Sequence, residues 1–243
     1  MEIVCHKGAN HVAPENTYAA AEAALNQGAS WVEADVWTSR DGEMVVIHDA
    51  TVDRTTNGSG YVLQLTTAEL AKLDAGSWFH SAFAGERIPV LREFLQWMRG
   101  RGKVFLDVKF AHPQQLLDLI YASGMVDSCF LWSASELWMS LVHELDPTMP
   151  LKVNVEIPAQ VEIAQETFGA QIVEVPAEKL SYELVQTCRA RGLKLMALCL
   201  DHDARSFRDL LRWQPDMVNL DRLDVFLQVA DELQSSRVRR GLS

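Results

Sequence analysis

Two histidines near the N-terminus are placed to exchange protons with a substrate. His6 and His48 each follow a short apolar run and stand beside a turn. Imidazole gains and loses protons near neutral pH, so such a pair can supply both the base and the acid that cleavage of a phosphodiester requires. We interpret the other histidines as ordinary core or surface side chains: His11, His80, His112, His143 and His202.

Three carboxylates could hold a divalent cation close to this pair. Glu33 and Asp35 are two residues apart in an apolar run, so in a strand both side chains point to the same side. Two like charges there repel one another, whereas a divalent cation binds both and adds a strong field for phosphate oxygens. Asp107 ends a later apolar run and supplies a third oxygen ligand. The alternative is that one carboxylate caps a helix or pairs with a lysine.

A site for an anionic substrate needs local positive charge, because the chain is acidic overall. The formal net charge is -11 and the isoelectric point is about 5.1. This charge argues against nucleic acid or an anionic membrane as a partner, and it favours a small molecule. Lys7 and Lys109 stand beside the predicted site and could contact phosphate, although each could instead form a salt bridge with the carboxylates.

Eight short apolar runs, each followed by a segment of helical periodicity, predict an α/β fold. Eight βα units in 243 residues suit a (β/α)8 TIM barrel, in which functional side chains project from the carboxyl ends of the strands. The helical segments end at glycine, which is typical of helix C-termini. The predicted strands are 2–5, 31–36, 104–108, 129–132, 151–155, 171–175, 194–198 and 217–220, and the clearest helices are 18–27, 91–98, 114–122 and 184–191.

One stretch interrupts this rhythm after the second strand. An Asp41-Gly42 turn leads into a further extended run at 43–47, and a polar, glycine-rich stretch follows through Gly60. Residues 74–87 carry tryptophan and phenylalanine side chains and predict an irregular, lid-like loop. We therefore expect a single barrel domain over residues 1–243, with an insertion and lid-like loop at 43–88.

The cysteines and the N-terminal residues indicate the compartment. The four cysteines are scattered without a close pair, which favours buried, reduced thiols. The first residues lack the basic and apolar segments of a signal peptide, and no apolar run reaches the ~18 residues of a membrane span. We therefore expect a cytoplasmic protein without stable membrane association. Homo-oligomerisation is left open.

A series of motifs resembles the glycerophosphodiester phosphodiesterase family of the phosphatidylinositol phospholipase C-like phosphodiesterase superfamily. The resemblance is strong from residue 1 to about 110, whereas the second half matches only in its βα rhythm. The motifs follow in the family's order: HKG at 6–8, APENT at 13–17, GA at 28–29, EADV at 33–36, VVIHD at 45–49, RTT at 54–56 and IPVLRE at 88–93.

The resemblance implies a reaction, a cofactor and roles for individual residues. The reaction would be metal-dependent hydrolysis of a glycerophosphodiester to glycerol 3-phosphate and an alcohol, a step of glycerol and lipid metabolism, with one Mg²⁺ or Ca²⁺ ion. His6 and His48 would be the catalytic pair. Glu33, Asp35 and Asp107 would be the metal ligands. The residues that would contact or support the substrate are Lys7, Lys109, Glu15 and Asn16.

Three positions depart from the family pattern. Lys7 replaces the arginine of the family's HRG motif, which keeps the charge but loses the planar bidentate contact with phosphate. Asp107 stands where the family usually has glutamate, so its shorter side chain must move the cation or admit a water. The aromatic residue expected after the seventh strand is missing from Leu198-Cys199-Leu200-Asp201, and Trp132 could replace it at the substrate.

Two other functions and two nucleophiles stay open. A phospholipase D-like enzyme acting on lysophospholipids, or on another diester, would need an apolar groove and access to a membrane. A catalytically idle barrel could instead bind a phosphodiester without turnover. For the hydrolase, the nucleophile is either water or the neighbouring glycerol hydroxyl, which would give a cyclic phosphate. Metal-dependent hydrolysis would separate an enzyme from a binding protein.

Overall fold

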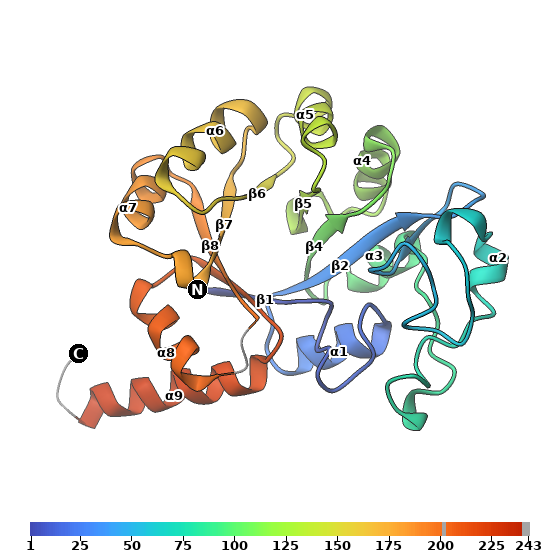
Figure 1. Ribbon diagram of the computed structural model, residues 1–243, viewed down its shortest axis with the longest axis horizontal. Coiled ribbons are helices and arrows are strands. Elements are labelled where there is room, and N and C mark those ends of the chain that lie inside the picture. The colour runs from blue at the N-terminus through green and yellow to red at the C-terminus, as the bar shows by residue number, and fades with distance from the viewer. Residues whose placement is uncertain (201–202, 240–243) are drawn as a thin grey trace.

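The chain folds into a nearly closed barrel of parallel strands surrounded by helices (Figure 1). The computed structural model describes residues 1–200 and 203–239. The strands are β1 (Glu2–Cys5), β2 (Trp31–Thr38), β3 (Met44–Val46), β4 (Lys103–Val108), β5 (Cys129–Trp132), β6 (Lys152–Asn154), β7 (Ile172–Pro176), β8 (Lys194–Cys199) and β9 (Met217–Leu220). The eight parallel strands are paired in the order β5-β4-β2-β1-β9-β8-β7-β6. A parallel bridge between Leu131 and Leu151 joins the two ends of this order, so the predicted TIM barrel is confirmed.

Helices follow the strands and cover the outside of the barrel (Figure 1). Their N-termini are set by local capping: the Thr17 side chain accepts from Ala20 N, and the Ser181 side chain accepts from Leu184 N. The second cap makes that helix begin two residues before the predicted start. The helices are α1 (Tyr18–Asn26), α2 (Thr67–Leu70), α3 (Leu91–Met98), α4 (Pro113–Ala122), α5 (Glu136–Leu145), α6 (Pro158–Phe168), α7 (Tyr182–Ala190), α8 (Ala204–Trp213) and α9 (Leu223–Arg239), with 3-10 turns at Val62–Gln64, Ser81–Phe83, Val126–Ser128 and Ala177–Lys179.

β2 shows how the sequence separates the two sides of the barrel wall. Val32, Ala34 and Val36 join the main apolar core between strands and helices, whereas Trp31 belongs to a second cluster inside the barrel. Successive side chains of a strand point to opposite faces, so Glu33 and Asp35 share the inner face with Trp31. The inner cluster consists of Val4, Trp31, Phe105, Phe130, Ile172, Met196 and Met217, and it fills the barrel below these carboxylates.

The insertion at 43–88 lies beside the carboxyl half of β2 and packs around a core of its own. β3 pairs antiparallel with β2, and Val45 forms a further bridge with Val90. In Figure 1 the insertion lies on the side of the barrel next to α3. The expected irregular segment 74–87 is organised by Asp74, whose side chain accepts from the backbone N–H groups of Gly76, Ser77 and Gly85. The insertion's apolar core consists of Val45, Ile47, Val52, Val62, Leu70, Ala75 and Ile88.

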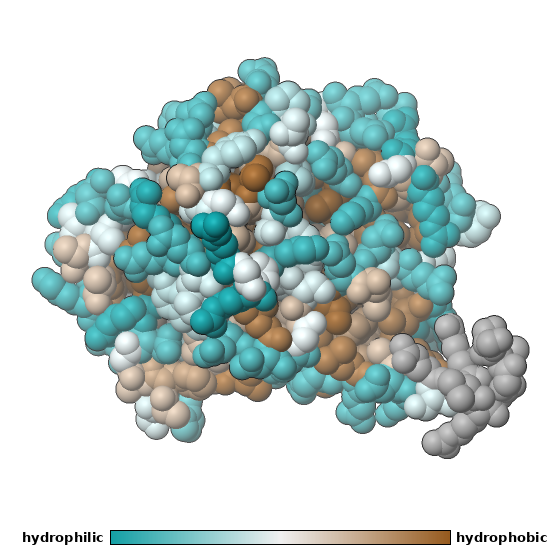
Figure 2. Space-filling view, turned by 180° about the vertical axis from the view of Figure 1, so that it is seen from behind, coloured by the Kyte–Doolittle hydropathy of each residue, from teal (hydrophilic) through white to brown (hydrophobic). Residues whose placement is uncertain are grey.

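The surface and the cysteines agree with the expectations from composition. All four cysteines are buried, and the structure shows no disulfide among the residues it describes. Within residues 1–200 and 203–239, no helix is long and apolar enough to cross a bilayer. The face behind the view of Figure 1 is largely hydrophilic, with apolar side chains in small groups between polar ones (Figure 2). Two residues to which we assigned features lie outside the described residues: Asp201 and His202.

Candidate active site

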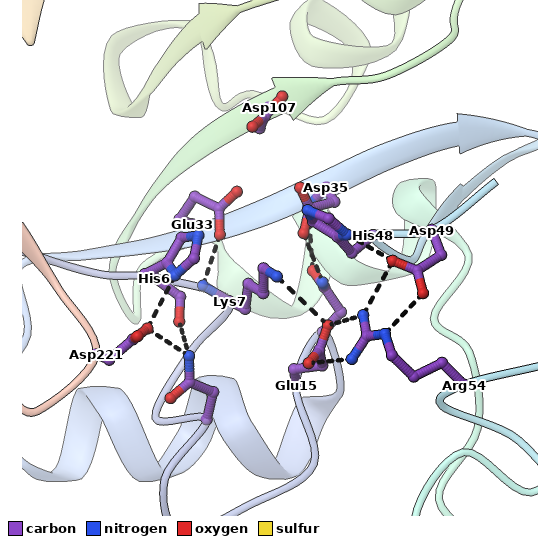
Figure 3. A network of polar contacts seen from close by, with 12 residues as sticks. His6, Lys7, Glu15, Glu33, Asp35, His48, Asp49, Arg54, Asp107 and Asp221 are labelled. Atoms are coloured by element: carbon purple, nitrogen blue, oxygen red, sulfur yellow. Dashed lines mark hydrogen bonds and ion pairs between the residues drawn. The ribbon is translucent and has the colours of Figure 1, made fainter. Parts of the chain in front are cut away.

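Two neighbouring strands bring the three acidic side chains together. Glu33 and Asp35 come from β2, and Asp107 comes from β4, where it stands opposite Asp35 in the strand register. One oxygen of each side chain lies within 4.8 Å of the others. The carboxylates project into the same space from adjacent strands (Figure 3). Residues far apart in sequence thus form one acidic cluster.

The acidic cluster is buried and holds oxygens without partners. Glu33 is 1% exposed and Asp35 is fully buried. Burial, together with the charges of Asp35 and Asp107, raises the pKa of Glu33 well above its usual value, and burial with the charge of Asp35 also raises the pKa of Asp107. Glu33 Oε1 and Asp107 Oδ1 have no hydrogen-bond partner among the residues that the structure describes. Buried carboxylate oxygens that converge in this way suit a hard divalent cation.

Lys109 partly neutralises the cluster. Its Nζ lies 3.0 Å from Asp35 Oδ1 and 2.7 Å from Asp107 Oδ2. Burial alone lowers the pKa of Lys109, but the charges of Asp35 and Asp107 outweigh burial and raise it. The alternative that this lysine pairs with the carboxylates is therefore what the structure shows, and its position at the cluster also leaves it close to where phosphate oxygens would bind.

His6 is oriented by a carboxylate that sequence reasoning missed. His6 Nδ1 lies 2.8 Å from Oδ1 of Asp221, which directly follows β9. Asn10 holds this arrangement, because its amide donates both to Asp221 Oδ1 (2.6 Å) and to the backbone oxygen of His6 (3.1 Å). A carboxylate at Nδ1 fixes the ring and leaves Nε2 for proton exchange. The sequence contained a signal for this residue, since Asp221 directly follows the predicted strand 217–220. Asp107 has a similar position near the end of the predicted strand 104–108.

His48 has a matching carboxylate on the other side of the cluster (Figure 3). Its Nδ1 lies 2.7 Å from Asp49 Oδ1, and the indole N–H of Trp37 anchors the His48 backbone oxygen to β2 at 2.9 Å. Arg54 donates to both carboxyl oxygens of Asp49 and, at 2.8 Å, to both oxygens of Glu15. Hydrogen bonds from Arg54 hold the pKa of Asp49 well below its usual range. The insertion thus supplies a fixed histidine to the barrel.

Lys7, Glu15 and Asn16 form a second layer around the carboxylates. The Lys7 backbone N–H donates to Glu33 Oε2 at 2.5 Å, and its Nζ lies 3.6 Å from Glu15 Oε1. Asn16 is 7% exposed; its amide donates to Asp35 Oδ2 (2.7 Å), and its carbonyl accepts from the Asp35 backbone N–H (3.1 Å). These contacts fix both carboxylates of β2, and the Lys7 ammonium lies beside Glu15.

Gly8 allows this layer to pack against α1. Its φ is +76°, and a Cβ at this position would lie 2.7 Å from the backbone carbon of Ala20. Any side chain here would both strain the backbone and collide with the helix. Gly8 therefore fixes the turn that presents His6 and Lys7 to the cluster.

A buried ion pair forms the floor under the cluster, and we assigned no role to its members from the sequence. Lys152 Nζ lies 2.6 Å from Glu174 Oε2 and 2.7 Å from Asn154 Oδ1, and Lys152 is 1% exposed. The amide of Asn219 donates to Glu174 Oε1 at 2.9 Å. The Lys152 ammonium also lies 4.2 Å from the centre of the Trp132 ring. The floor thus links three strands of the second half to the carboxyl end of β5.

Two histidines that we interpreted as structural have polar partners. His11 Nε2 lies 3.3 Å from Asp224 Oδ1, and the His80 ring accepts from Ala82 N. The first contact joins the loop after β1 to the first turn of α9, and the second lies within the insertion. They show no convergence with the acidic cluster.

Comparisons with known proteins give one consistent result. The model of the glycerophosphoryl diester phosphodiesterase family matches residues 6–225. The glycerophosphodiester phosphodiesterase of Caldanaerobacter subterraneus subsp. tengcongensis is 51% identical over 210 residues, which cover 82% of this chain and 85% of that protein. The solved glycerophosphodiester phosphodiesterase of Agrobacterium tumefaciens has a TM-score of 0.89 and 36% identity over 93% of this chain and 98% of its own. An Oleispira antarctica phosphodiesterase, solved with its product sn-glycerol-3-phosphate, has a TM-score of 0.82 and 27% identity over 95% and 97% of the two chains.

Proposed function

Because this chain belongs to the glycerophosphoryl diester phosphodiesterase family and is therefore a phosphoric diester hydrolase, we propose that it hydrolyses glycerophosphodiesters by His/His acid-base catalysis with one divalent cation. The products would be glycerol 3-phosphate and an alcohol. The observation that carries the proposal is the pair of carboxylate-bound imidazoles on either side of a buried acidic cluster. The glycerol phosphate bound by the Oleispira antarctica phosphodiesterase supports the same product here.

Glu33, Asp35 and Asp107 would hold the cation, and their buried oxygens without partners support this assignment. When bound, Mg²⁺ or Ca²⁺ supplies the positive charge that binds a phosphate oxygen and polarises the phosphorus. Lys109 would add a second positive charge at the phosphate, since its ammonium already lies against Asp35 and Asp107. Lys7 would contact the phosphate as a point charge, without the bidentate fork of arginine.

His6 and His48 would share the two proton transfers. One imidazole takes the proton from the nucleophile, and the other gives a proton to the departing alkoxide. Asp221 and Asp49 lie at the two Nδ1 atoms, so each ring would present Nε2 to the substrate. Each carboxylate would stabilise the imidazolium that forms after proton uptake. The same arrangement serves attack by water and attack by the neighbouring glycerol hydroxyl.

Replacing each histidine by alanine tests this assignment. His6→Ala and His48→Ala should each lower kcat for a glycerophosphodiester by about 10²- to 10⁴-fold, the usual contribution of a general acid or base. Formation of glycerol 3-phosphate would be measured in Mg²⁺ and in Ca²⁺, and His80→Ala serves as the control because His80 lies in the insertion away from the acidic cluster. Turnover within a few-fold of wild type in either catalytic variant would show that the assignment of that histidine is wrong.

A further inference from the structure

A side pocket opens where the barrel is least tightly closed. β5 and β6 are joined through the Leu131–Leu151 bridge, whereas neighbouring strands elsewhere pair in longer ladders. A cavity of about 160 Å³ lies at the carboxyl ends of β5 and β6, and we refer to it as the seam pocket. The residues of the seam pocket that matter here are Trp132, Ala134, Glu136, Met139, Asn154 and Phe168.

The seam pocket adjoins the acidic cluster. Trp132 lies opposite Asp107 in the register of β4 and β5, and the ammonium of Lys109 lies 5.9 Å from the centre of its ring. On the opposite side of the seam pocket, Asn154 Oδ1 accepts from the Lys152 ammonium, which also lies over the Trp132 ring. The acid-base mechanism uses none of the seam pocket, yet a group attached to phosphate at the cluster would be within reach of it.

The volume of the seam pocket limits what can enter. Since a water occupies about 30 Å³ in the liquid, 160 Å³ accommodates roughly five waters, or an alcohol of similar size. Ethanolamine and glycerol are in this range. A fatty acyl chain is far larger than this volume.

The charge of the seam pocket favours a cation. Glu136 is the acidic residue among its lining residues; it is exposed and forms no ion pair with any residue that the structure describes. Met139 and Phe168 supply apolar walls for methylene groups. Two lysines already lie over the Trp132 ring, so the carboxylate, and not the ring, would attract an ammonium group.

We propose that the seam pocket receives the leaving alcohol and favours small alcohols that carry a positive charge. This proposal rests on the proposed hydrolysis of glycerophosphodiesters. It assigns specificity to residues of β5, α5 and β6, which belong to the half of the chain with the weaker motif resemblance. It also makes Glu136 a specificity residue for the leaving group, separate from the acid-base pair.

Three diesters with the same glycerol phosphate test the proposal, with methanol, glycerol or ethanolamine as the leaving alcohol. Wild type should have the highest kcat/KM for the ethanolamine diester. Glu136→Gln should lower the ratio of ethanolamine to glycerol diester by roughly two- to five-fold, as expected for an exposed ion pair. Glu144→Gln is the matched control, because it makes the same change at an exposed position of α5 outside the seam pocket.

Ala134→Phe tests the location, because Ala134 is exposed and a larger side chain can fill the seam pocket without entering the core. It should lower kcat/KM for the glycerol and ethanolamine diesters by about tenfold or more relative to the methanol diester. A circular dichroism spectrum and a Tm close to those of wild type show that the variant is folded.

The outcomes separate the two proposals. An unchanged ethanolamine-to-glycerol ratio in Glu136→Gln overturns the charge preference, and unchanged relative rates in Ala134→Phe overturn the location. In both cases hydrolysis of the diesters still supports the proposed function. If wild type hydrolyses none of the three diesters with Mg²⁺ or Ca²⁺, the proposed function fails and the role of the seam pocket fails with it.

Discussion

Replacing Glu33 by glutamine should stabilise the protein when no metal is bound. Glu33 is 1% exposed, and its carboxylate is buried beside those of Asp35 and Asp107. Glutamine keeps the shape of the side chain, and its amide oxygen can still accept from the Lys7 backbone N–H, as Glu33 Oε2 does. The substitution therefore removes a buried negative charge that repels its neighbours while keeping the local packing.

The size of the effect follows from the environment of Glu33. A buried polar group without a partner costs about 1–3 kcal/mol, and for a chain of this length about 1 kcal/mol corresponds to 2–4 °C in Tm. We therefore expect metal-free Glu33→Gln to unfold roughly 2–12 °C above metal-free wild type at neutral pH.

The pH dependence has a definite sign. Burial raises the folded-state pKa of Glu33 above its ordinary value of 4.5, so the folded protein binds more protons than the unfolded chain between these two values. The stability associated with Glu33 is therefore present below pH 4.5 and is lost as the pH rises through the folded-state pKa. The advantage of Glu33→Gln should accordingly be largest at neutral pH and should shrink as the pH is lowered toward 4.5.

Metal binding should offset or reverse the difference in Tm between the two proteins. At a concentration of 100 times Kd, a cation that binds only the folded state adds about 2.7 kcal/mol, or roughly 5–11 °C in Tm. Wild type should gain this amount in Mg²⁺ or Ca²⁺, whereas Glu33→Gln has lost one ligand charge and should gain little. Thermal unfolding followed by circular dichroism, with chelator and with each cation, measures both effects.

Glu174→Gln is the matched control, because it makes the same substitution in the same barrel interior. Glu174 is also buried, but it is paired with Lys152 at 2.6 Å. Its neutralisation leaves the Lys152 charge without its partner, so we expect destabilisation by about 3–5 kcal/mol. If metal-free Glu33→Gln were destabilised like Glu174→Gln, or if it kept the full metal-induced rise in Tm, the reasoning on the acidic cluster would be refuted.

Two further predictions concern the histidine and the cation. Asp221→Asn should lower kcat by about 10²- to 10⁴-fold with little change in KM, because His6 loses the group that orients its ring. Steady-state kinetics measure this, and an unchanged circular dichroism spectrum shows that the variant is folded. A rise in KM as large as the fall in kcat would contradict the prediction. Because burial raises the pKa of Glu33 and of Asp107, protons should compete with the cation at pH values above the ordinary carboxyl range. The apparent Mg²⁺ affinity measured by calorimetry should therefore already fall when the pH is lowered from 7 to 5.5. An affinity that does not change over this interval would argue against the raised pKa values.

The barrel could be predicted from the sequence because each strand shows as a short local run of apolar residues. The alternation in 31–36 gave both the strand and the side to which Glu33 and Asp35 point, and the structure has that strand at Trp31–Thr38. Helix starts were less certain where a polar cap decided them, as at Ser181. Closure between β5 and β6 depends on strands whose pairing is not local, so their short bridge and the seam pocket could not be predicted.

The candidate site was predictable where its residues end adjacent strands, and not where it depends on distant pairing. In a (β/α)8 barrel the functional side chains project from the carboxyl ends of the strands, and this rule predicted that Glu33, Asp35 and Asp107 lie together. Their convergence in the structure agrees with it. Asp221 could have been found by applying the same rule to the last strand. Lys152 gave no such signal, since it lies within an apolar run and its partner Glu174 is on another strand whose register the sequence does not specify.

Release of glycerol 3-phosphate by the wild-type protein is the most direct test of the central claim. The protein would be stripped with chelator, incubated with a glycerophosphodiester, and then supplied with Mg²⁺ or Ca²⁺. The account predicts no turnover in chelator and turnover that saturates with one of the two cations, over the same concentration range in which that cation raises Tm. Glycerol phosphate release that continues undiminished in chelator, or no release with either cation, would contradict it.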